Sequence, residues 1–171
     1  MLQFPLYEPF RLTSKFGARK DPISGSWSGH NGVDLATPVG TPVHSPQRGT
    51  VITSFTNDLG GNQIIIEHPG GFKTGYAHLS KKVASGTRVN KGDIVAYTGN
   101  TGRSTGPHLH LTVKKSGNLV DPLSVSWQLK PGTQLTGATK IKTSRRGLLL
   151  AGSALLLMAG GAYYYYNYIK K

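Results

Sequence analysis

Residues 106–114 read Gly106-Pro107-His108-Leu109-His110-Leu111-Thr112-Val113-Lys114. Polar and apolar side chains alternate along this run, and turn-forming residues lie on both sides of it, which is the pattern of a half-buried β-strand. Residues two apart in a strand share a face, so His108 and His110 project into the same space. Such a His-x-His pair is more often simple strand alternation than a metal site, and by itself it leaves both interpretations open.

The rest of the first 125 residues also has the pattern of β structure. Residues 63–68 form a β-branched run closed by Pro69-Gly70-Gly71, and residues 93–97 form another. Helical periodicity is nearly absent there. Short strands separated by Gly- and Pro-containing turns predict an all-β, antiparallel domain.

Two further segments carry candidate functional residues. His30 and Asp34 lie in His-Asn-Gly-Val-Asp, where an ordinary turn capped by the Asp is the alternative, and His78 lies in Gly-Tyr-Ala-His-Leu-Ser. Two imidazoles and one carboxylate, with a water molecule, are the donor set of a catalytic zinc site. A further imidazole beside such a site can transfer protons.

Three other side chains have less specific contexts. Tyr76 lies two residues before His78 and shares its face if both are in a strand, so it is either a phenolic donor or a packed core residue. His44 and His68 precede turn residues at expected strand ends, and we expect surface or turn roles for them.

Together these segments resemble the lysostaphin-type (LytM-like) zinc metalloendopeptidases, which cut peptide cross-links in bacterial cell walls. The resemblance covers roughly residues 10–125, in family order. The matching motifs are Thr13-Ser14-Lys15-Phe16-Gly17, His30-Asn31-Gly32-Val33-Asp34-Leu35-Ala36, Gly40-Thr41-Pro42-Val43, Gly49-Thr50-Val51, Tyr76-Ala77-His78-Leu79-Ser80, Val89-Asn90-Lys91-Gly92-Asp93, Gly99-Asn100-Thr101-Gly102, Ser104-Thr105-Gly106-Pro107-His108-Leu109-His110 and Asp121-Pro122.

The resemblance implies a compact two-sheet core with a metal groove across one sheet. It implies that His30, Asp34 and His110 are the ligands of one Zn²⁺ per chain, and that His78 and His108 are the catalytic pair. Peptidoglycan is the implied partner. Which imidazole is the general base stays open, as does the choice between a direct cross-link and a glycine bridge. The glycine pairs 60–61 and 70–71 are either groove-wall loops or ordinary hairpin turns.

Charge is distributed unevenly along the 171 residues. Lys and Arg number 20 against seven Asp and Glu, so the formal net charge is +13, and all seven acidic residues precede residue 122. A basic protein binds polyanions such as nucleic acid, anionic lipid or wall polymers. No basic patch interleaved with aromatic residues favours specific nucleic acid. The chain has no Cys, so its stability does not depend on disulfides.

The carboxyl-terminal segment predicts a membrane anchor. Residues 147–168 are uncharged and mostly apolar, about the length that a transmembrane helix needs, and basic residues lie on both sides of them. The alternative is a buried or appended hydrophobic helix. We therefore expect a metallopeptidase domain at 1–127, a flexible basic stalk at 128–146, a single-pass helix at 147–168 and a basic end at 169–171, with the membrane orientation open.

The setting and the class of function each leave an alternative. Residues 1–5 lack the pattern of a secretory signal, which favours a lytic enzyme in the membrane of a bacteriophage particle, used in host entry or lysis, over a tail-anchored bacterial envelope hydrolase.

Members of the family that have lost ligands serve as non-catalytic peptidoglycan-binding or hydrolase-activating modules. No ligand position is lost here, so we expect an enzyme. A third class of function, a basic membrane-tethered scaffold or nucleic-acid-binding protein, would explain the charge and the anchor but not the five site residues.

Overall fold

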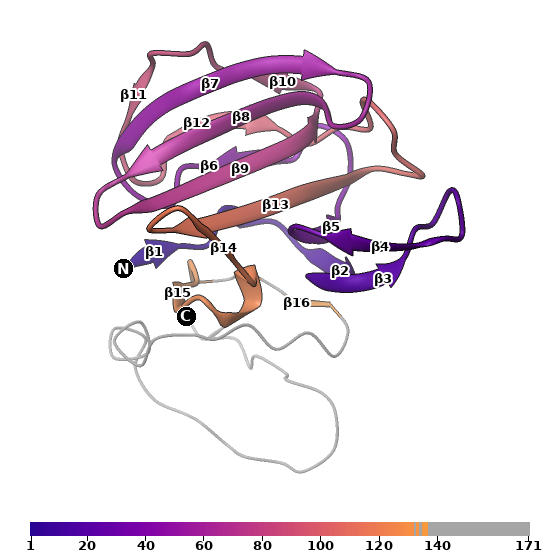
Figure 1. Cartoon of the computed structure of the whole chain (residues 1–171). Helices are drawn as coiled ribbons and strands as arrows, with labels where there is room; N and C mark the ends of the chain where they lie inside the picture. The colour runs from indigo at the N-terminus through magenta and orange to yellow at the C-terminus, as the bar shows by residue number, and fades with distance from the viewer. Residues whose placement is uncertain (132, 134, 137–171) are drawn as a thin grey trace, which may run out of the picture.

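The protein has an all-β fold, as the sequence predicts. The computed structural model describes residues 1–131, 133, 135 and 136, and within them the one helix is a 3₁₀ turn, η1 (Pro122–Ser124). None of these residues belongs to a helix long and apolar enough to cross a membrane. Figure 1 shows the strands gathered around a broad twisted sheet.

A nine-stranded sheet forms the body of the molecule. In spatial order its strands are β11 (Arg88–Val89), β7 (Gly49–Asn57), β8 (Gly61–His68), β9 (Phe72–Leu79), β13 (His108–Lys115), β5 (Val33–Ala36), β2 (Phe10–Ser14) and β16 (Leu135–Thr136), and β14 (Asn118–Val120) pairs with β13. Every pairing in this sheet is antiparallel except that of β16 with β2.

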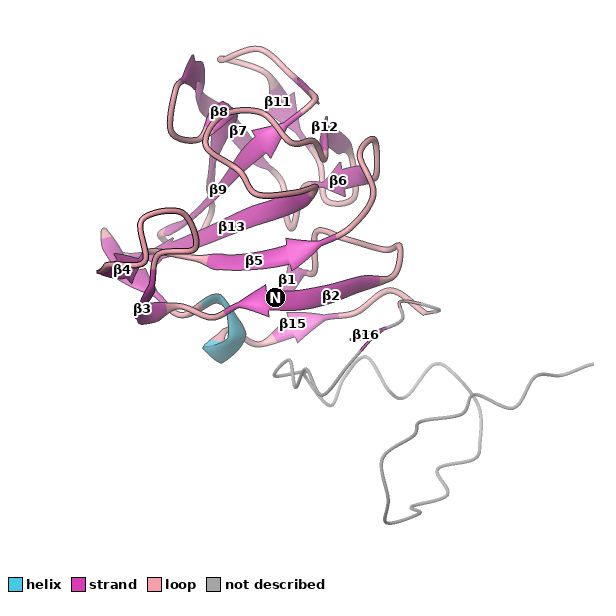
Figure 2. Cartoon of the chain, turned by 90° about the vertical axis from the view of Figure 1, so that its right-hand side faces the viewer, coloured by secondary structure: helices cyan, strands magenta, loops and turns pink. Residues whose placement is uncertain are grey.

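Three smaller sheets complete the described fold. The first contains β10 (Lys81–Lys82), β12 (Ile94–Tyr97) and β6 (Pro42–His44), the second pairs β1 (Leu2–Gln3) in parallel with β15 (Trp127–Gln128), and the third is the hairpin of β3 (Gly17–Lys20) and β4 (Trp27–His30). Figure 2 shows this hairpin at one end of β5 and β2.

The strand β13 confirms the alternation predicted for residues 108–114. Leu109, Leu111 and Val113 are fully buried, whereas His108 and His110 are half-buried on the other face. Val43 and Val95 from the three-stranded sheet belong to the same buried cluster as these residues, so the two sheets share one core. Burial of a Leu or Val side chain stabilises a fold by about 1.5–3 kcal/mol, which fixes the register of β13 and hence the face on which its histidines lie.

Three described residues of the expected stalk pair with the sheets. Gln128 belongs to β15, and Leu135 and Thr136 form β16, whose backbone pairs with Phe10 and Arg11 of β2. Trp127 is fully buried and donates its indole N–H to the Pro122 carbonyl at 2.7 Å, which anchors the chain just before this segment. The predicted transmembrane helix at 147–168 and the basic end at 169–171 lie outside the described residues.

Candidate active site

Three strands bring the predicted metal ligands together. His110 of β13 lies directly opposite Asp34 of β5 in the antiparallel register, and His30 ends β4, with two residues between it and the start of β5. The link between β4 and β5 passes very close to β13, where a Cβ on Gly32 would lie 2.3 Å from the Leu111 carbonyl oxygen and 2.9 Å from the His110 ring. A glycine is therefore required there for His30 to approach His110.

The ligand atoms converge on one point. Oδ1 of Asp34 lies 2.8 Å from Nδ1 of His110 and 3.2 Å from Nε2 of His30, and the two nitrogens are 3.1 Å apart. Zinc with bonds near 2.0–2.1 Å in tetrahedral geometry holds its ligand atoms roughly 3.3 Å apart. The triangle is close to that size, and both its chemistry and its dimensions fit a zinc ion.

Outer hydrogen bonds orient the two ligand imidazoles. Nδ1 of His30 donates to the Lys15 carbonyl at 2.8 Å, and Nε2 of His110 donates to Oδ1 of Asn31 at 2.9 Å. A ring nitrogen that faces an oxygen acceptor carries the hydrogen, so the other nitrogen presents its lone pair to the cluster. Such outer partners fix the tautomer and the ring plane of a metal-binding histidine.

The predicted catalytic pair lies beside this cluster. The ring centroids of His78 and His108 are 4.5 Å apart, and Nε2 of His108 is 3.7 Å from Oδ1 of Asp34. Nδ1 of His108 donates to the Gly106 carbonyl at 2.7 Å, and Nδ1 of His78 donates to the Thr101 carbonyl at 2.8 Å. Both rings therefore present an Nε2 lone pair.

Burial shapes the protonation of the site. Burial lowers the pKa of His78, and the nearby His108 and His110 lower it further against the raising effect of the Thr101 carbonyl. Burial alone would raise the pKa of Asp34, but its close contacts with the His110 and His30 rings hold this pKa well below its usual range. Near neutral pH the site thus combines a neutral His78 with an ionised Asp34, the states required for proton acceptance and metal binding.

A β-bulge aims His78 at the site. The register between β8 and β9 shifts between Asn62 and Ile64, and His78 has a left-handed backbone with φ of 61°. Its backbone N–H donates to the Gly60 carbonyl at 2.8 Å, which secures the bulge. Bulges re-aim side chains next to active sites, and a positive φ on a non-glycine residue is costly enough to require such support.

The bulge also decides the role of Tyr76. Tyr76 pairs with Leu111, is 2% exposed and belongs to the core cluster, so the packing interpretation holds. The expectation that it shares a face with His78 is wrong, because the extra residue of the bulge interrupts the alternation between them. Burial also raises its pKa, which keeps the phenol neutral.

The other candidate residues lie away from the cluster. His44 stacks on Tyr7 with ring centroids 3.7 Å apart. His68 is 4% exposed, so the surface alternative is wrong for it: His68 ends β8 directly before the turn, and its buried ring bonds to the Thr74 hydroxyl at 2.8 Å. The turn at glycines 60–61 contacts Thr101 beside the site, whereas the turn at 70–71 is an ordinary hairpin turn at the other end of the sheet.

The sequence did not single out several residues that contact the site histidines or Asp34. They include Asn31, which orients His110; Thr101, which orients His78; Ser104, whose Oγ lies 3.2 Å from Nδ1 of His108; and Arg19, whose Nη2 lies 3.5 Å from Oδ2 of Asp34. Asn31, Thr101 and Ser104 occur within the quoted motifs, which is the available signal. Arg19 lies outside those motifs, and its contact depends on the folding of the hairpin.

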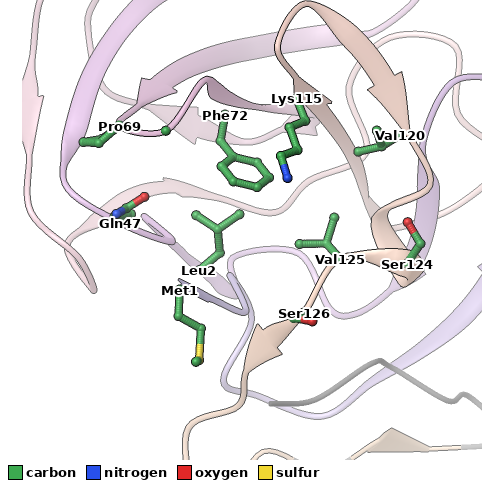
Figure 3. A pocket seen from close by; sticks show the side chains of 11 residues that line it. Met1, Leu2, Gln47, Pro69, Phe72, Lys115, Val120, Ser124, Val125 and Ser126 are labelled. Atoms are coloured by element: carbon green, nitrogen blue, oxygen red, sulfur yellow. The ribbon is translucent and has the colours of Figure 1, made fainter. Parts of the chain in front are cut away.

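An open apolar pocket of the described residues is separate from the histidines. It has a volume of about 680 Å³ and lies at the opposite end of β13, where Leu2, Phe72 and Val125 line it and Lys115 reaches over it (Figure 3). None of the site histidines lines this cavity.

The fold and the site together define an all-β metallopeptidase-like domain, and comparisons with known proteins agree. The model of peptidase family M23 matches residues 28–122. The DD-carboxypeptidase/endopeptidase Mpg of Neisseria meningitidis is 40% identical over 130 residues, which are 76% of this chain and 30% of that protein. The peptidoglycan DD-endopeptidase ShyA of Vibrio cholerae is 36% identical over 126 residues, 72% of this chain and 29% of that protein.

Solved structures give the same result. A zinc-containing peptidase from Vibrio cholerae superposes with a TM-score of 0.64 at 39% identity, covering 74% of this chain and 41% of that one. The catalytic domain of lysostaphin from Staphylococcus simulans superposes with a TM-score of 0.59 at 33% identity, covering 66% and 89%. The chain belongs to peptidase family M23, and it spans about 30% of the length of the curated relatives that it matches.

Proposed function

We propose that this protein is a zinc-dependent endopeptidase that hydrolyses peptide cross-links of bacterial peptidoglycan. The observation that carries the proposal is the triangle of ligand atoms from His30, Asp34 and His110, with sides of 2.8–3.2 Å. Membership in family M23 and the peptidoglycan endopeptidases among its relatives support the substrate. Because no ligand position is lost, catalysis is favoured over a purely binding or activating module.

In this proposal His30, Asp34 and His110 hold the zinc ion. When bound, zinc polarises the scissile carbonyl and lowers the pKa of a water molecule toward neutrality. His78 and His108 then handle the proton, since each presents an Nε2 lone pair and keeps Nδ1–H on a backbone carbonyl. An Nε2 that accepts the water proton becomes a donor to the leaving amine or to the developing oxyanion. Both rings meet these conditions.

We further propose that residues 147–168 anchor the domain in a membrane, that of a bacteriophage particle in preference to a bacterial envelope. The uncharged apolar run, with Arg145 and Arg146 before it and Lys170 and Lys171 after it, supports the anchor. Full-length protein should pellet with lipid vesicles and resist extraction by alkaline carbonate, whereas a chain ending at Thr143 should not pellet. Recovery of the intact chain in the soluble fraction without detergent would contradict the anchor.

The catalytic proposal is tested on purified sacculi. Zinc-loaded full-length protein should release soluble fragments whose masses show uncross-linked stem peptides, and the chelated protein should release none. A zinc-loaded protein that binds sacculi of several chemotypes without releasing fragments would instead favour the non-catalytic peptidoglycan-binding module.

A further inference from the structure

Arg19 is a cation that faces the site from the β3–β4 hairpin. In the register of that hairpin Gly17 pairs with His30 and Arg19 pairs with Ser28, so the side chain of Arg19 shares the face of His30. Its Nη2 lies 3.5 Å from Oδ2 of Asp34, on the side of that carboxylate away from the imidazoles, which contact Oδ1. The side chain is 28% exposed, so part of it is accessible to solvent beside Asp34.

Most of the hydrogen-bonding capacity of this guanidinium is unused. Within the part of the chain that the structure describes, Nε of Arg19 is buried without a partner, and Asp34 is the ionic partner of Arg19. Arg103, the other guanidinium near the hairpin, makes two hydrogen bonds to Asp21 at 2.8 and 3.2 Å. A guanidinium carries five donors, four of them on its two Nη atoms, so Arg19 has Nη donors available for another anion, whereas those of Arg103 already bind Asp21.

Holding the metal does not account for this placement. A positive guanidinium beside a site for a doubly charged cation repels that cation, and the single carboxylate of Asp34 does not offset both charges. The same arrangement attracts an anion that enters the site with the substrate. These charges therefore indicate that the free donors of Arg19 bind an anionic group of the substrate and do not help to hold the metal ion.

We propose that Arg19 binds a substrate carboxylate next to the scissile amide, and so selects peptides that carry this charge over neutral glycine bridges. This inference rests on the proposed peptidase function. In an amino-acid residue that supplies the leaving nitrogen, a carboxylate on the same α-carbon has its carbon about 2.5 Å from that nitrogen. A group so close to the reacting bond lies within reach of a guanidinium that already touches a metal ligand.

The experiment compares two cross-linked peptides that differ in one group, a carboxylate or a carboxamide on the carbon next to the leaving nitrogen. Zinc-loaded full-length protein should cleave the carboxylate peptide with a kcat/KM roughly 10- to 100-fold higher, the scale of a hydrogen-bonded charge. Arg19→Gln should lose this preference, mainly through the carboxylate peptide. Arg19→Lys should keep part of it, because the charge remains and the planar fork does not.

Lys20→Gln is the matched control, because it removes the same charge from the next residue of β3, on the opposite face of the hairpin. It should keep the preference and the zinc content of the wild type. Equal cleavage of both peptides by the wild type would overturn the inference. An Arg19→Gln variant whose kcat/KM falls by the same factor on both peptides would also overturn it. That result would show that Arg19 acts by positioning Asp34 and not by binding the substrate carboxylate.

Failure of the peptidase proposal is a separate outcome. If the zinc-loaded wild type cleaves neither peptide and no sacculi, calorimetric binding of the two peptides still tests Arg19. Tighter binding of the carboxylate peptide by the wild type, lost in Arg19→Gln and kept in Lys20→Gln, supports the carboxylate site. Equal binding of both peptides by the wild type refutes it.

Discussion

Each site histidine has one ring nitrogen fixed on an oxygen and the other facing the cluster. Three of them use Nδ1 on a backbone carbonyl, and His110 uses Nε2 on the Asn31 amide oxygen. The quoted motifs led to five predicted site positions, and the structure brings these five residues close together. The tautomers could not be predicted, because their hydrogen-bond partners, such as Lys15 and Thr101, come close only through tertiary folding.

Metal content distinguishes the proposed metal ligands from the proposed catalytic pair. His110→Ala and His30→Ala should each lose most of the zinc, because two ligands cannot replace the three that converge here. Metal analysis of the purified variants, with His44→Ala as a control outside the cluster, measures this loss. Full zinc occupancy in both ligand variants would show that the metal is bound elsewhere.

His78→Ala and His108→Ala should retain zinc and lose peptide cleavage. Removal of a general acid/base or an oxyanion donor typically lowers turnover by roughly a hundredfold or more. The measurement is kcat on a soluble cross-linked peptide, with zinc content determined on the same samples. Near wild-type kcat in both variants would place the proton transfer on other residues.

At the scale of elements, one ion pair joins two loops beside the site. Asp21 begins the turn of the β3–β4 hairpin, and Arg103 lies in the segment that leads into β13. Backbone hydrogen bonds from Ser24 and Ile23, together with Arg103, hold the pKa of Asp21 well below its usual range. Because both groups are near the surface, the pair contributes little to global stability and mainly restricts the two loops.

Arg103→Gln should therefore loosen these loops without unfolding the domain. Amide hydrogen exchange at residues 21–26 and 100–106 should become faster, while the melting temperature stays nearly unchanged. Arg88→Gln, an exposed residue of β11, is the control for loss of one charge. The difference in amide exchange rate between the two variants should become smaller at high salt, which screens exposed charges. Unchanged exchange in both loops would show that backbone contacts alone hold them.

The periodicity of the sequence predicted the strands of this sheet but not its β-bulge or the packing of its hairpin. Alternation located β13 and the face of its histidines, because each step of two residues must bury an apolar side chain. The bulge that separates Tyr76 from His78 left no such mark, since one extra residue changes the local pairing and not the composition. The contact of Arg19 with Asp34 was likewise not predicted, because it depends on how a hairpin packs against another strand.

At the scale of the whole molecule, one buried histidine couples stability to pH. His68 ends β8 with Nδ1 donating to the Arg48 carbonyl at 3.2 Å and Nε2 accepting from the Thr74 hydroxyl at 2.8 Å. This arrangement suits the neutral ring. Burial lowers the pKa of His68 below its ordinary value of 6.5, against the raising effect of the Arg48 and Gln47 carbonyls.

The sign of the pH effect follows from that lowered pKa. Below pH 6.5 the unfolded chain protonates His68 while the folded domain does not, so the unfolded state binds more protons and stability falls with falling pH until the folded pKa is reached. This one group changes the free energy of unfolding by at most about 1.4 kcal/mol per pH unit. His68→Gln should be less stable at pH 8 but should lose stability less steeply between pH 6.5 and 5. Denaturant unfolding of both zinc-loaded proteins across this range measures the difference, and parallel curves would show that His68 titrates alike in the folded and unfolded states.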